Sequence, residues 1–267
     1  MFDNADIFSF CIYTDEDDRS RQSAVKCVES GRAHGVEVDL YSAVYFKTMD
    51  HVHEQYGLKL KYKPVSGNGT DYKDMTAPRT KIANGTTHYL LYKWAVKHDR
   101  PIHILEHDAL FVGRPPQPIY DGVIQTSSHK TFGMTPELLW GCGRALKMRK
   151  REPDRGYDWS WDKTKGVIPH PLSGTNGTSG YIIGPGAAAK MVSSIETDGI
   201  ANADLIRTEH IGEGNLYLQN PQSVFCTHSV KSHHLTLKPL SSHCLITNIQ
   251  RPKRFGVLKQ VQNSGLK

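Results

Sequence analysis

A short apolar segment that ends in two acids lies at residues 100–111, which read RPIHILEHDALF. Pro101 to Leu105 is apolar enough for a buried strand, and Glu106 and Asp108 follow at its end. Open α/β sheets bind ligands at the carboxyl ends of their strands, and an acid-x-acid segment there can hold a hard divalent cation that binds a diphosphate. The same pattern also fits a strand that simply ends in exposed acids, so the segment alone leaves both interpretations open.

The beginning of the chain predicts the first unit of a parallel sheet. Ile7–Tyr13 is apolar and aromatic, Ser20–His34 has apolar positions at helical spacing, and Val36–Tyr41 alternates like a second strand. This order of strand, helix and strand is typical of α/β proteins. The polar loop Thr14–Arg19 follows the first strand, where nucleotides are often bound. It contains neither a GxGxxG motif nor a P-loop, which argues against a dinucleotide-binding protein or an ATPase.

The alternation of helices and strands continues beyond this unit. A short helix, a long polar loop, a second helix and a short strand are expected at Phe46–Tyr56, Lys61–Pro78, Thr86–His98 and Asp121–Gln125. A Gly-rich segment that runs into a strand, a helix opened by a proline and two late strands are expected at Thr175–Ile183, Pro185–Ile195, Leu216–Leu218 and Val224–Cys226.

Composition and charge describe a globular, basic protein. The 267 residues are 38% hydrophobic and 22% charged, which is enough to bury a core in one large domain or two small ones. Lys and Arg exceed Asp and Glu by 33 − 27 = 6, with a sequence pI of about 9.0. A surplus of this size permits a polyanionic partner without requiring one.

Cysteines and terminal signals favour an intracellular protein. The five cysteines are odd in number and form no CxxC pair, which is typical of reduced thiols rather than of a disulfide framework or a zinc site. The N-terminus lacks the positive region of a signal peptide, and no apolar run approaches the roughly 20 residues of a membrane span. The Asn-Gly-Thr triplets at Asn68, Asn84 and Asn176 would be glycan acceptors in a secreted protein, and are otherwise expected in turns or Gly-rich loops.

Periodicity fails over Ser127–Pro171, where basic residues precede two tryptophans. The residues are Lys147, Arg149, Lys150, Arg151, Arg155, Trp159 and Trp161. Such a segment suits a phosphate backbone and a stacked base or sugar, and it also suits a solvated insertion whose tryptophans pack on the body of the protein.

Four motifs in order resemble the family 25 glycosyltransferases, the lipopolysaccharide-biosynthesis and collagen galactosyl transferases. Thr87–Ala95 occupies the position of the family's S-H-L-x-x-W-x-x-A helix, and Leu105–Asp108 occupies the position of its L-E-D-D segment. Gly177–Ala187 stands for G-T-x-x-Y-x-I-S-x-x-G-A, and Asp204 for the Asp of a P-V-D segment. The resemblance covers most of residues 7–228. It departs from the family at His107, which replaces the middle acid, and at Ala83-Asn84, where the family has Gly-Cys.

The resemblance implies an α/β fold of the GT-A type. Residues 1–230 would form a Rossmann-like domain with a mostly parallel central sheet flanked by helices and an irregular insertion around 127–171. Residues 231–267, which are basic and contain histidines, would pack on this domain or trail from it.

The resemblance also implies a set of site residues. Mn²⁺ or Mg²⁺ would be bound by Asp108, Glu106 and His228, with His233 and His234 as substitutes for that histidine. Asp204 would be the general base of an inverting reaction, with Glu209 and Glu213 as nearby alternatives. The nucleotide-sugar, with UDP the expected nucleotide, would contact Thr14, Asp15, Arg19, Arg79, Lys81, His88 and His107. The resemblance carries no motif over to Ser127–Pro171. The basic and aromatic character of that segment, rather than the resemblance, suggests that the acceptor would contact Lys150, Arg151, Trp159 and Trp161, together with Gly177 and Thr178. A lone histidine such as His88 is also typical of a helix cap or a packing residue.

The resulting hypothesis is a metal-dependent glycosyltransferase in the cytoplasm of a bacterium or a phage-infected bacterium, with no protein partner evident. Its acceptor would be a hydroxylated base in DNA, as in phage DNA glycosylation, or a bacterial surface saccharide. A base in duplex DNA would first have to be flipped out of the helix. A third alternative is a non-catalytic protein that binds a sugar nucleotide or DNA, which the replacement at His107 suggests.

Overall fold

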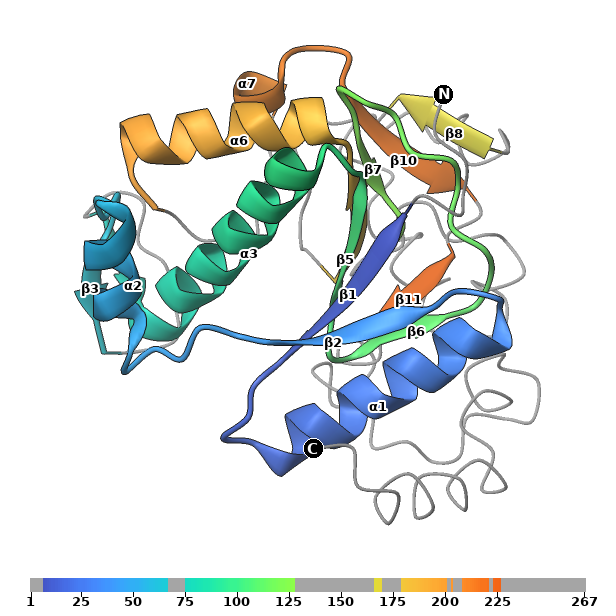
Figure 1. Ribbon diagram of the computed structural model, residues 1–267, viewed down its shortest axis with the longest axis horizontal. Helices are drawn as coiled ribbons and strands as arrows, with labels where there is room; N and C mark the ends of the chain where they lie inside the picture. The colour runs from blue at the N-terminus through green and yellow to red at the C-terminus, as the bar shows by residue number, and fades with distance from the viewer. Residues whose placement is uncertain are drawn as a thin grey trace, which may run out of the picture.

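The computed structural model has a central sheet of seven strands, most of which are labelled in Figure 1. The structure describes residues 7–66, 75–127, 166–169, 179–200, 203, 208–220 and 223–226. The strand order is β2-β1-β5-β9-β7-β10-β8. In that order the strands span Val38–Ser42, Phe8–Tyr13, Ile102–Glu106, Gly180–Ile183, Val123–Gln125, Leu216–Asn220 and Gly166–Pro169.

The sheet is mixed. β2, β1 and β5 are parallel neighbours, as are β7 and β10, whereas β9 runs antiparallel to both β5 and β7. At the far edge, β8 runs antiparallel to β10. Five strands therefore share one direction and β9 and β8 run the other way. The α/β prediction is confirmed, and the predicted mostly parallel sheet applies to those five strands.

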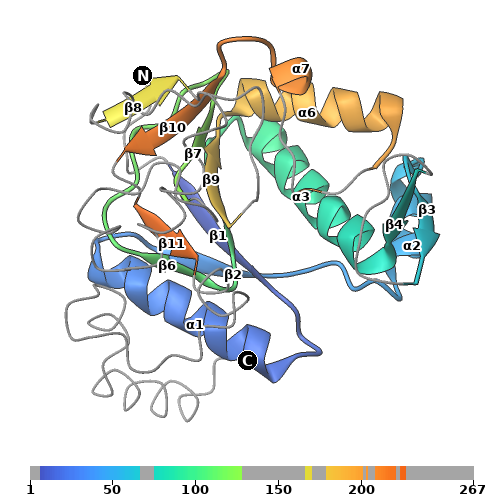
Figure 2. The same cartoon turned by 180° about the vertical axis from the view of Figure 1, so that it is seen from behind.

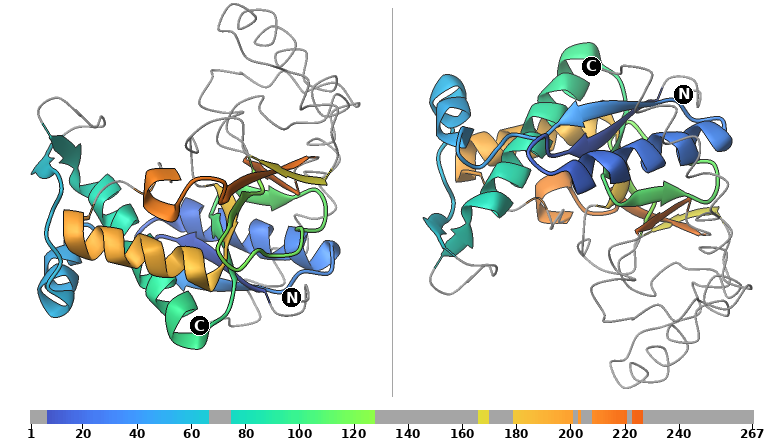
Figure 3. Two further views of the ribbon diagram at one scale, coloured as in Figure 1. Left: turned by 90° about the horizontal axis from the view of Figure 1, so that it is seen from above. Right: turned by 90° about the horizontal axis from the view of Figure 1, so that it is seen from below.

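Helices cover both faces of the sheet (Figures 1 and 3). On one face, α3 (Arg79–His98) and α6 (Pro185–Asp198) pack over alternate strand residues, among them Phe10, Ile12 and Ile104. On the other face, α1 (Asp18–Ala33) packs with Cys11 and Leu105, which point the opposite way. Strands buried on both faces read as continuous apolar runs, which is why β1 and β5 are recognisable in the sequence.

Smaller elements complete the described part. The antiparallel pair β6 (Ala109–Phe111) and β11 (Val224–Cys226) lies on the α1 side, where Phe111 and Val224 join the α1 core. Helix α2 (Met49–Tyr56) lies near the parallel pair β3 (Lys63–Val65) and β4 (Thr76–Pro78) (Figure 2). The short helix α7 (Thr208–Ile211) follows α6. Among the helices of this part of the chain, none combines the length and the apolar character that crossing a membrane requires.

Several boundaries differ from the sequence prediction. Helix α3 begins at Arg79, directly after Pro78, rather than at Thr86. The hydroxyls of Thr86 and Thr87 donate to the carbonyls of Ile82 and Ala83, one turn earlier in the same helix. The triplet that begins at Asn84 is therefore helical, and its prediction as a turn is wrong.

Two segments predicted to be irregular contain strands. The loop Lys61–Pro78 includes β3 and β4, and the insertion 127–171 includes β8. These strands have only three or four residues, too few to show a period in the sequence. Residues 128–165, 170–178 and 231–267 lie outside the described residues, so the predicted C-terminal segment and most of the insertion lie there too.

The turn from β9 into α6 packs tightly against residues 119–122. Gly184 donates its N–H to the Gly122 carbonyl at 3.0 Å, and Gly186 donates to the Tyr120 carbonyl at 3.0 Å. A Cβ on Gly184 would sit well inside van der Waals contact of the Ile119 and Tyr120 carbonyl oxygens. Because these are backbone atoms, a side chain at this position cannot be accommodated by a rotamer change.

We therefore expect Gly184→Ala to lower the free energy of unfolding by about 3 kcal/mol, the upper part of the usual range for overpacking. Gly113→Ala is the matched control, since its Cβ would meet nothing closer than 3.8 Å. Urea denaturation of both variants measures the difference. Equal stabilities would show that the β9–α6 turn is not closely packed.

Candidate functional site

A cleft of about 330 Å³ opens at the carboxyl ends of the three adjacent parallel strands β1, β2 and β5. Its lining residues are Ile12, Tyr13, Thr14, Ala43, Val44, Tyr45, Phe46, Thr80, Ala83, Asn84, Glu106 and His107. Residues 12–14 lie at the end of β1 and just after it, and residues 43–46 follow β2. Thr80, Ala83 and Asn84 belong to the first turns of α3, and Glu106 and His107 lie at the end of β5 and just after it. The cleft therefore lies where open α/β sheets bind ligands.

The register of the parallel strands places the residues at the ends of β1, β2 and β5 next to one another. Ile12 lies opposite Glu106 across the β1–β5 pair, and Tyr13 lies opposite Ser42 across the β1–β2 pair. Residues that end neighbouring parallel strands must share one edge of the sheet. Thr14 and Glu106, which are far apart in sequence, consequently line the same cleft.

The predicted acid pair lies at the turn from β5 to β6. Glu106 lines the cleft and its N–H donates to the Ser179 carbonyl at 3.1 Å, while Asp108 is half-buried in the same turn. The pKa of the Cys11 thiol is raised by its hydrogen bond to Cys27 and by burial, and additionally by the negative charges of Asp108 and Glu106. Both carboxylates therefore lie close enough to Cys11, in the α1 core, to disfavour its thiolate.

Three residues at the β1–α1 junction, Thr14, Asp15 and Arg19, were predicted to contact the donor, and only Thr14 is among the lining residues. Thr14 lines the cleft, and its N–H donates to the Ser20 hydroxyl at 3.0 Å. Asp15 accepts a 2.5 Å hydrogen bond from the Ser42 hydroxyl, which lowers the pKa of that carboxyl. Arg19 is outside the lining and pairs with Asp17, the N-cap of α1, at 3.2 Å.

An aromatic wall faces the cleft from the segment between β2 and α2. The rings of Tyr45 and Phe46 meet edge to face at a centroid distance of 4.6 Å. The Lys47 ammonium lies 5.6 Å and 6.0 Å from the two ring centroids. These two residues were not among the predicted site residues, because Tyr45 lies between the predicted strand Val36–Tyr41 and the predicted helix that begins at Phe46. Two adjacent aromatic residues in a segment that follows a strand were the available signal.

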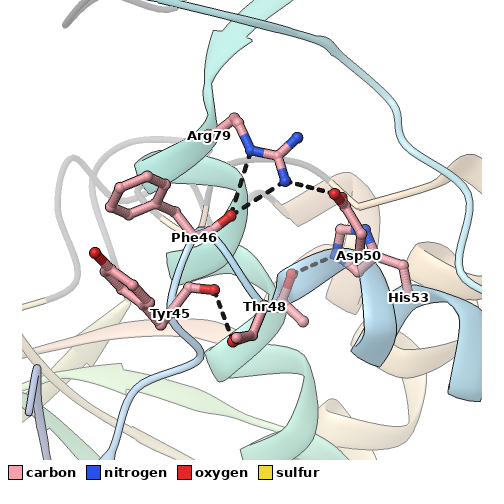
Figure 4. Close-up of polar contacts among 7 residues, drawn as sticks. Tyr45, Phe46, Thr48, Asp50, His53 and Arg79 are labelled. Carbon is pink, nitrogen blue, oxygen red and sulfur yellow. Dashed lines mark hydrogen bonds and ion pairs between the residues drawn. The ribbon is translucent and has the colours of Figure 1, made fainter.

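Arg79 and Lys81, two predicted donor contacts, are not among the lining residues. The Arg79 guanidinium donates to the Phe46 carbonyl from Nε and Nη2, at 3.3 Å and 3.2 Å, and to the Asp50 carboxylate at 2.6 Å (Figure 4). Arg79 thus contacts the wall of the cleft rather than its interior. The residues that α3 presents to the cleft are Thr80, Ala83 and Asn84.

His88 belongs to a buried polar network rather than to the cleft. Its Nδ1 lies 2.6 Å from the Tyr181 hydroxyl, and the two rings stack at 5.8 Å with an interplanar angle of 11°. The Tyr181 hydroxyl lies 2.7 Å from that of Tyr92. Burial raises the pKa of both tyrosines, so their hydroxyls stay neutral at physiological pH.

A second, smaller cavity of about 50 Å³ lies on the other side of His88, between α3 and α6. It is lined by Lys61, Gly85, His88, Tyr92, Met191, Ser194, Ile195, Asp198, Gly199, Ala203 and His210. Asn84 lines the cleft and the next residue, Gly85, lines this cavity, so α3 separates the two. Ala203 directly precedes the predicted base, Asp204.

Many predicted site residues lie outside the described part of the chain. They are Asp204, His228, His233, His234, Lys150, Arg151, Trp159, Trp161, Gly177 and Thr178. Glu209 belongs to α7 but its side chain is also outside the description, and Glu213 is exposed in the turn after α7. Within the described ranges, no three His, Cys, Asp or Glu side chains gather as a metal-binding group.

Comparison with known proteins does not assign the chain to a family. No family model matches the chain, and no curated protein matches it significantly. The likeness to family 25 glycosyltransferases therefore depends on the four sequence motifs.

The network around Tyr181 leads to a stability prediction. Tyr181→Phe removes the hydroxyl that contacts both His88 and Tyr92, whereas Tyr92→Phe removes only one of these contacts. Each lost contact in a buried site costs about 1–3 kcal/mol. We expect the loss of unfolding free energy in Tyr181→Phe to be about twice that in Tyr92→Phe, measured by urea denaturation. A smaller effect in Tyr181→Phe would contradict the network.

Proposed function

We propose that this chain is a metal-dependent glycosyltransferase with a GT-A-type fold, and that the 330 Å³ cleft is its nucleotide-sugar site. The observation that carries the proposal is the position of the acid-x-acid segment. Glu106 and Asp108 follow the central parallel strand β5, and Glu106 lines a cleft of suitable size at that strand's carboxyl end. Five strands of common direction with helices on both faces support a Rossmann-like domain.

The cleft offers distinct surfaces for the parts of a nucleotide-sugar. Tyr45 and Phe46 provide aromatic surface on which a base can stack, a contact worth about 1–3 kcal/mol per base. Thr14 lies at the end of β1, where open sheets bind nucleotides. The opposite side, formed by Glu106 and His107, would face the diphosphate.

A divalent cation fits the charge balance of this cleft. Its lining, as far as the structure describes it, contains one carboxylate and no Lys or Arg, so a diphosphate bound there lacks a cationic side chain. Glu106 and Asp108 would each supply oxygen ligands of the kind that Mn²⁺ and Mg²⁺ prefer, and the diphosphate would supply others. The cation would stabilise the charge that develops on the departing diphosphate.

The reaction would be a substitution at the anomeric carbon. The bond from that carbon to the diphosphate oxygen breaks, and the oxygen leaves with the electron pair. The acceptor hydroxyl forms the new bond and gives its proton to a general base, for which Asp204 is the candidate. Asp204 lies outside the described residues, and its neighbour Ala203 lines the smaller cavity that α3 separates from the cleft.

The proposal predicts which carboxylates are essential for cation-dependent donor binding. Glu106→Gln and Asp108→Asn should lose most of the thermal stabilisation that UDP confers on the wild type in the presence of Mn²⁺, because ligands of the native state raise its stability. The matched control is Asp121→Asn, an exposed acid paired with Lys190 before β7. The same experiment with GDP and other nucleoside diphosphates identifies the base.

Two outcomes would count against the site. If no nucleoside diphosphate stabilised the wild type with Mn²⁺ present, the cleft would not be a nucleotide site. If both variants behaved like Asp121→Asn, the cation would bind elsewhere. Nucleotide binding without any transfer or hydrolysis would favour the alternative of a non-catalytic protein on the same fold.

For the acceptor, we propose a hydroxylated base in DNA, with a bacterial surface saccharide as the alternative. The surplus of six positive charges supports a polyanionic acceptor. The residues expected to contact it lie outside the described part of the chain; they are Lys150, Arg151, Trp159, Trp161, Gly177 and Thr178.

The acceptor proposal predicts a steep salt dependence. Binding to duplex DNA should weaken by about tenfold or more between 50 and 200 mM salt, as counterions are released from the phosphates. Fluorescence anisotropy with labelled DNA measures this effect, and Lys150→Gln with Arg151→Gln should reduce its slope. An absence of DNA binding at low salt would leave the saccharide acceptor.

A further inference from the structure

The aromatic wall of the cleft is built from a segment without regular secondary structure. Residues 43–48 connect β2 to α2 (Figure 1). They supply four lining residues of the cleft. A segment of this kind has no hydrogen-bond ladder of its own to set its shape. The orientation of Tyr45 and Phe46 therefore depends on one turn within the segment and on contacts with neighbouring elements.

Helix α3 supplies these contacts at two points. Thr87 accepts a 2.9 Å hydrogen bond from the Val44 N–H, and Arg79 donates twice to the Phe46 carbonyl. The two points lie on either side of Tyr45, whose own carbonyl accepts from the N–H and hydroxyl of Thr48 at 2.9 Å and 3.2 Å. Figure 4 shows the Arg79 side of this arrangement, with the guanidinium between the Phe46 carbonyl and Asp50.

Of the two Arg79 contacts, the one to the carbonyl is the structurally important one. Asp50 is 65% exposed, and an ion pair in that setting contributes little. Helix α2 is moreover attached to α3 by a second contact, because His53 Nε2 lies 2.7 Å from the buried Thr86 hydroxyl. Two N–H groups of the planar Arg79 guanidinium meet this one carbonyl, a paired contact that the compact ammonium of a lysine does not reproduce.

We propose that Arg79 is a positioning residue of the donor site: it orients Phe46, and with it Tyr45, as the surface on which the base of the nucleotide-sugar stacks. The inference rests on the proposed function, since it concerns the nucleotide in the same cleft. It also gives Arg79 a different role from the direct donor contact expected from the sequence. Arg79 acts on the nucleotide through the wall and not through the phosphates.

The test measures the affinity of UDP and GDP, each with Mn²⁺, by isothermal titration calorimetry. Arg79→Lys keeps the positive charge and should weaken the preferred nucleotide by about tenfold, as expected for loss of hydrogen bonds that orient a stacking surface. Asp50→Asn keeps the carbonyl contact and should bind like the wild type. Arg114→Lys is the matched control, an exposed arginine after β6 and outside the cleft lining.

A double-mutant cycle separates positioning from direct contact. In a Tyr45→Leu, Phe46→Leu background, which keeps the backbone carbonyl but removes both rings, Arg79→Lys should add little to the loss of affinity. Additive losses would mean that Arg79 contacts the phosphates and would overturn the inference. An unchanged affinity in Arg79→Lys, with or without a lower Tm, would also overturn it by showing a role in stability alone. If the wild type bound no nucleoside diphosphate with Mn²⁺ present, the proposed function itself would fail and this inference with it.

Discussion

The parallel pairing of β1 with β2 and β5 is the constraint on which the candidate site depends. Parallel neighbours end at the same edge of the sheet, so the loops that follow them must meet there. Through this pairing, Glu106 lies in the same cleft as Thr14 and the segment after Ser42. The pairing is stabilised from both faces, by the α3–α6 core on one side and the α1 core on the other.

Helix α3 connects this edge of the sheet to the rest of the molecule. Its first turns line the cleft, its Arg79 and Thr87 contact the β2–α2 segment, and its His88 joins the buried tyrosines. A helix with so many buried polar contacts cannot shift by a turn without breaking several of them at once. We infer that α3 provides the rigid side of the cleft, against which the irregular segment 43–48 is held in place.

The predicted site is recovered best where it depends on the ends of strands. Thr14, Glu106 and His107 line the cleft, because the backbone of a residue at the end of a buried parallel strand lies at the carboxyl end of the sheet, independently of its side-chain conformation. Arg79, Lys81 and His88 do not line it, because the direction of a helical side chain depends on how the helix is rotated, and local sequence does not show this rotation. The aromatic wall of Tyr45 and Phe46 was missed because the segment that carries it has no period of its own.

The amino-acid pattern alone is sufficient for the α/β class, for the places of β1, α1, β5 and α6, and for the acids that follow β5. Buried strands and proline-initiated helices are encoded locally, in apolar runs and in backbone geometry. Three features are decided only in three dimensions. They are the antiparallel position of β9 between β5 and β7, the pairing of β8 with β10, and the hydrogen bonds from Arg79 to the Phe46 carbonyl. Each of these contacts joins residues that are distant in sequence, and at least one partner in each is a backbone N–H or carbonyl group. Because every residue has such groups, the amino-acid sequence does not show which of them will pair.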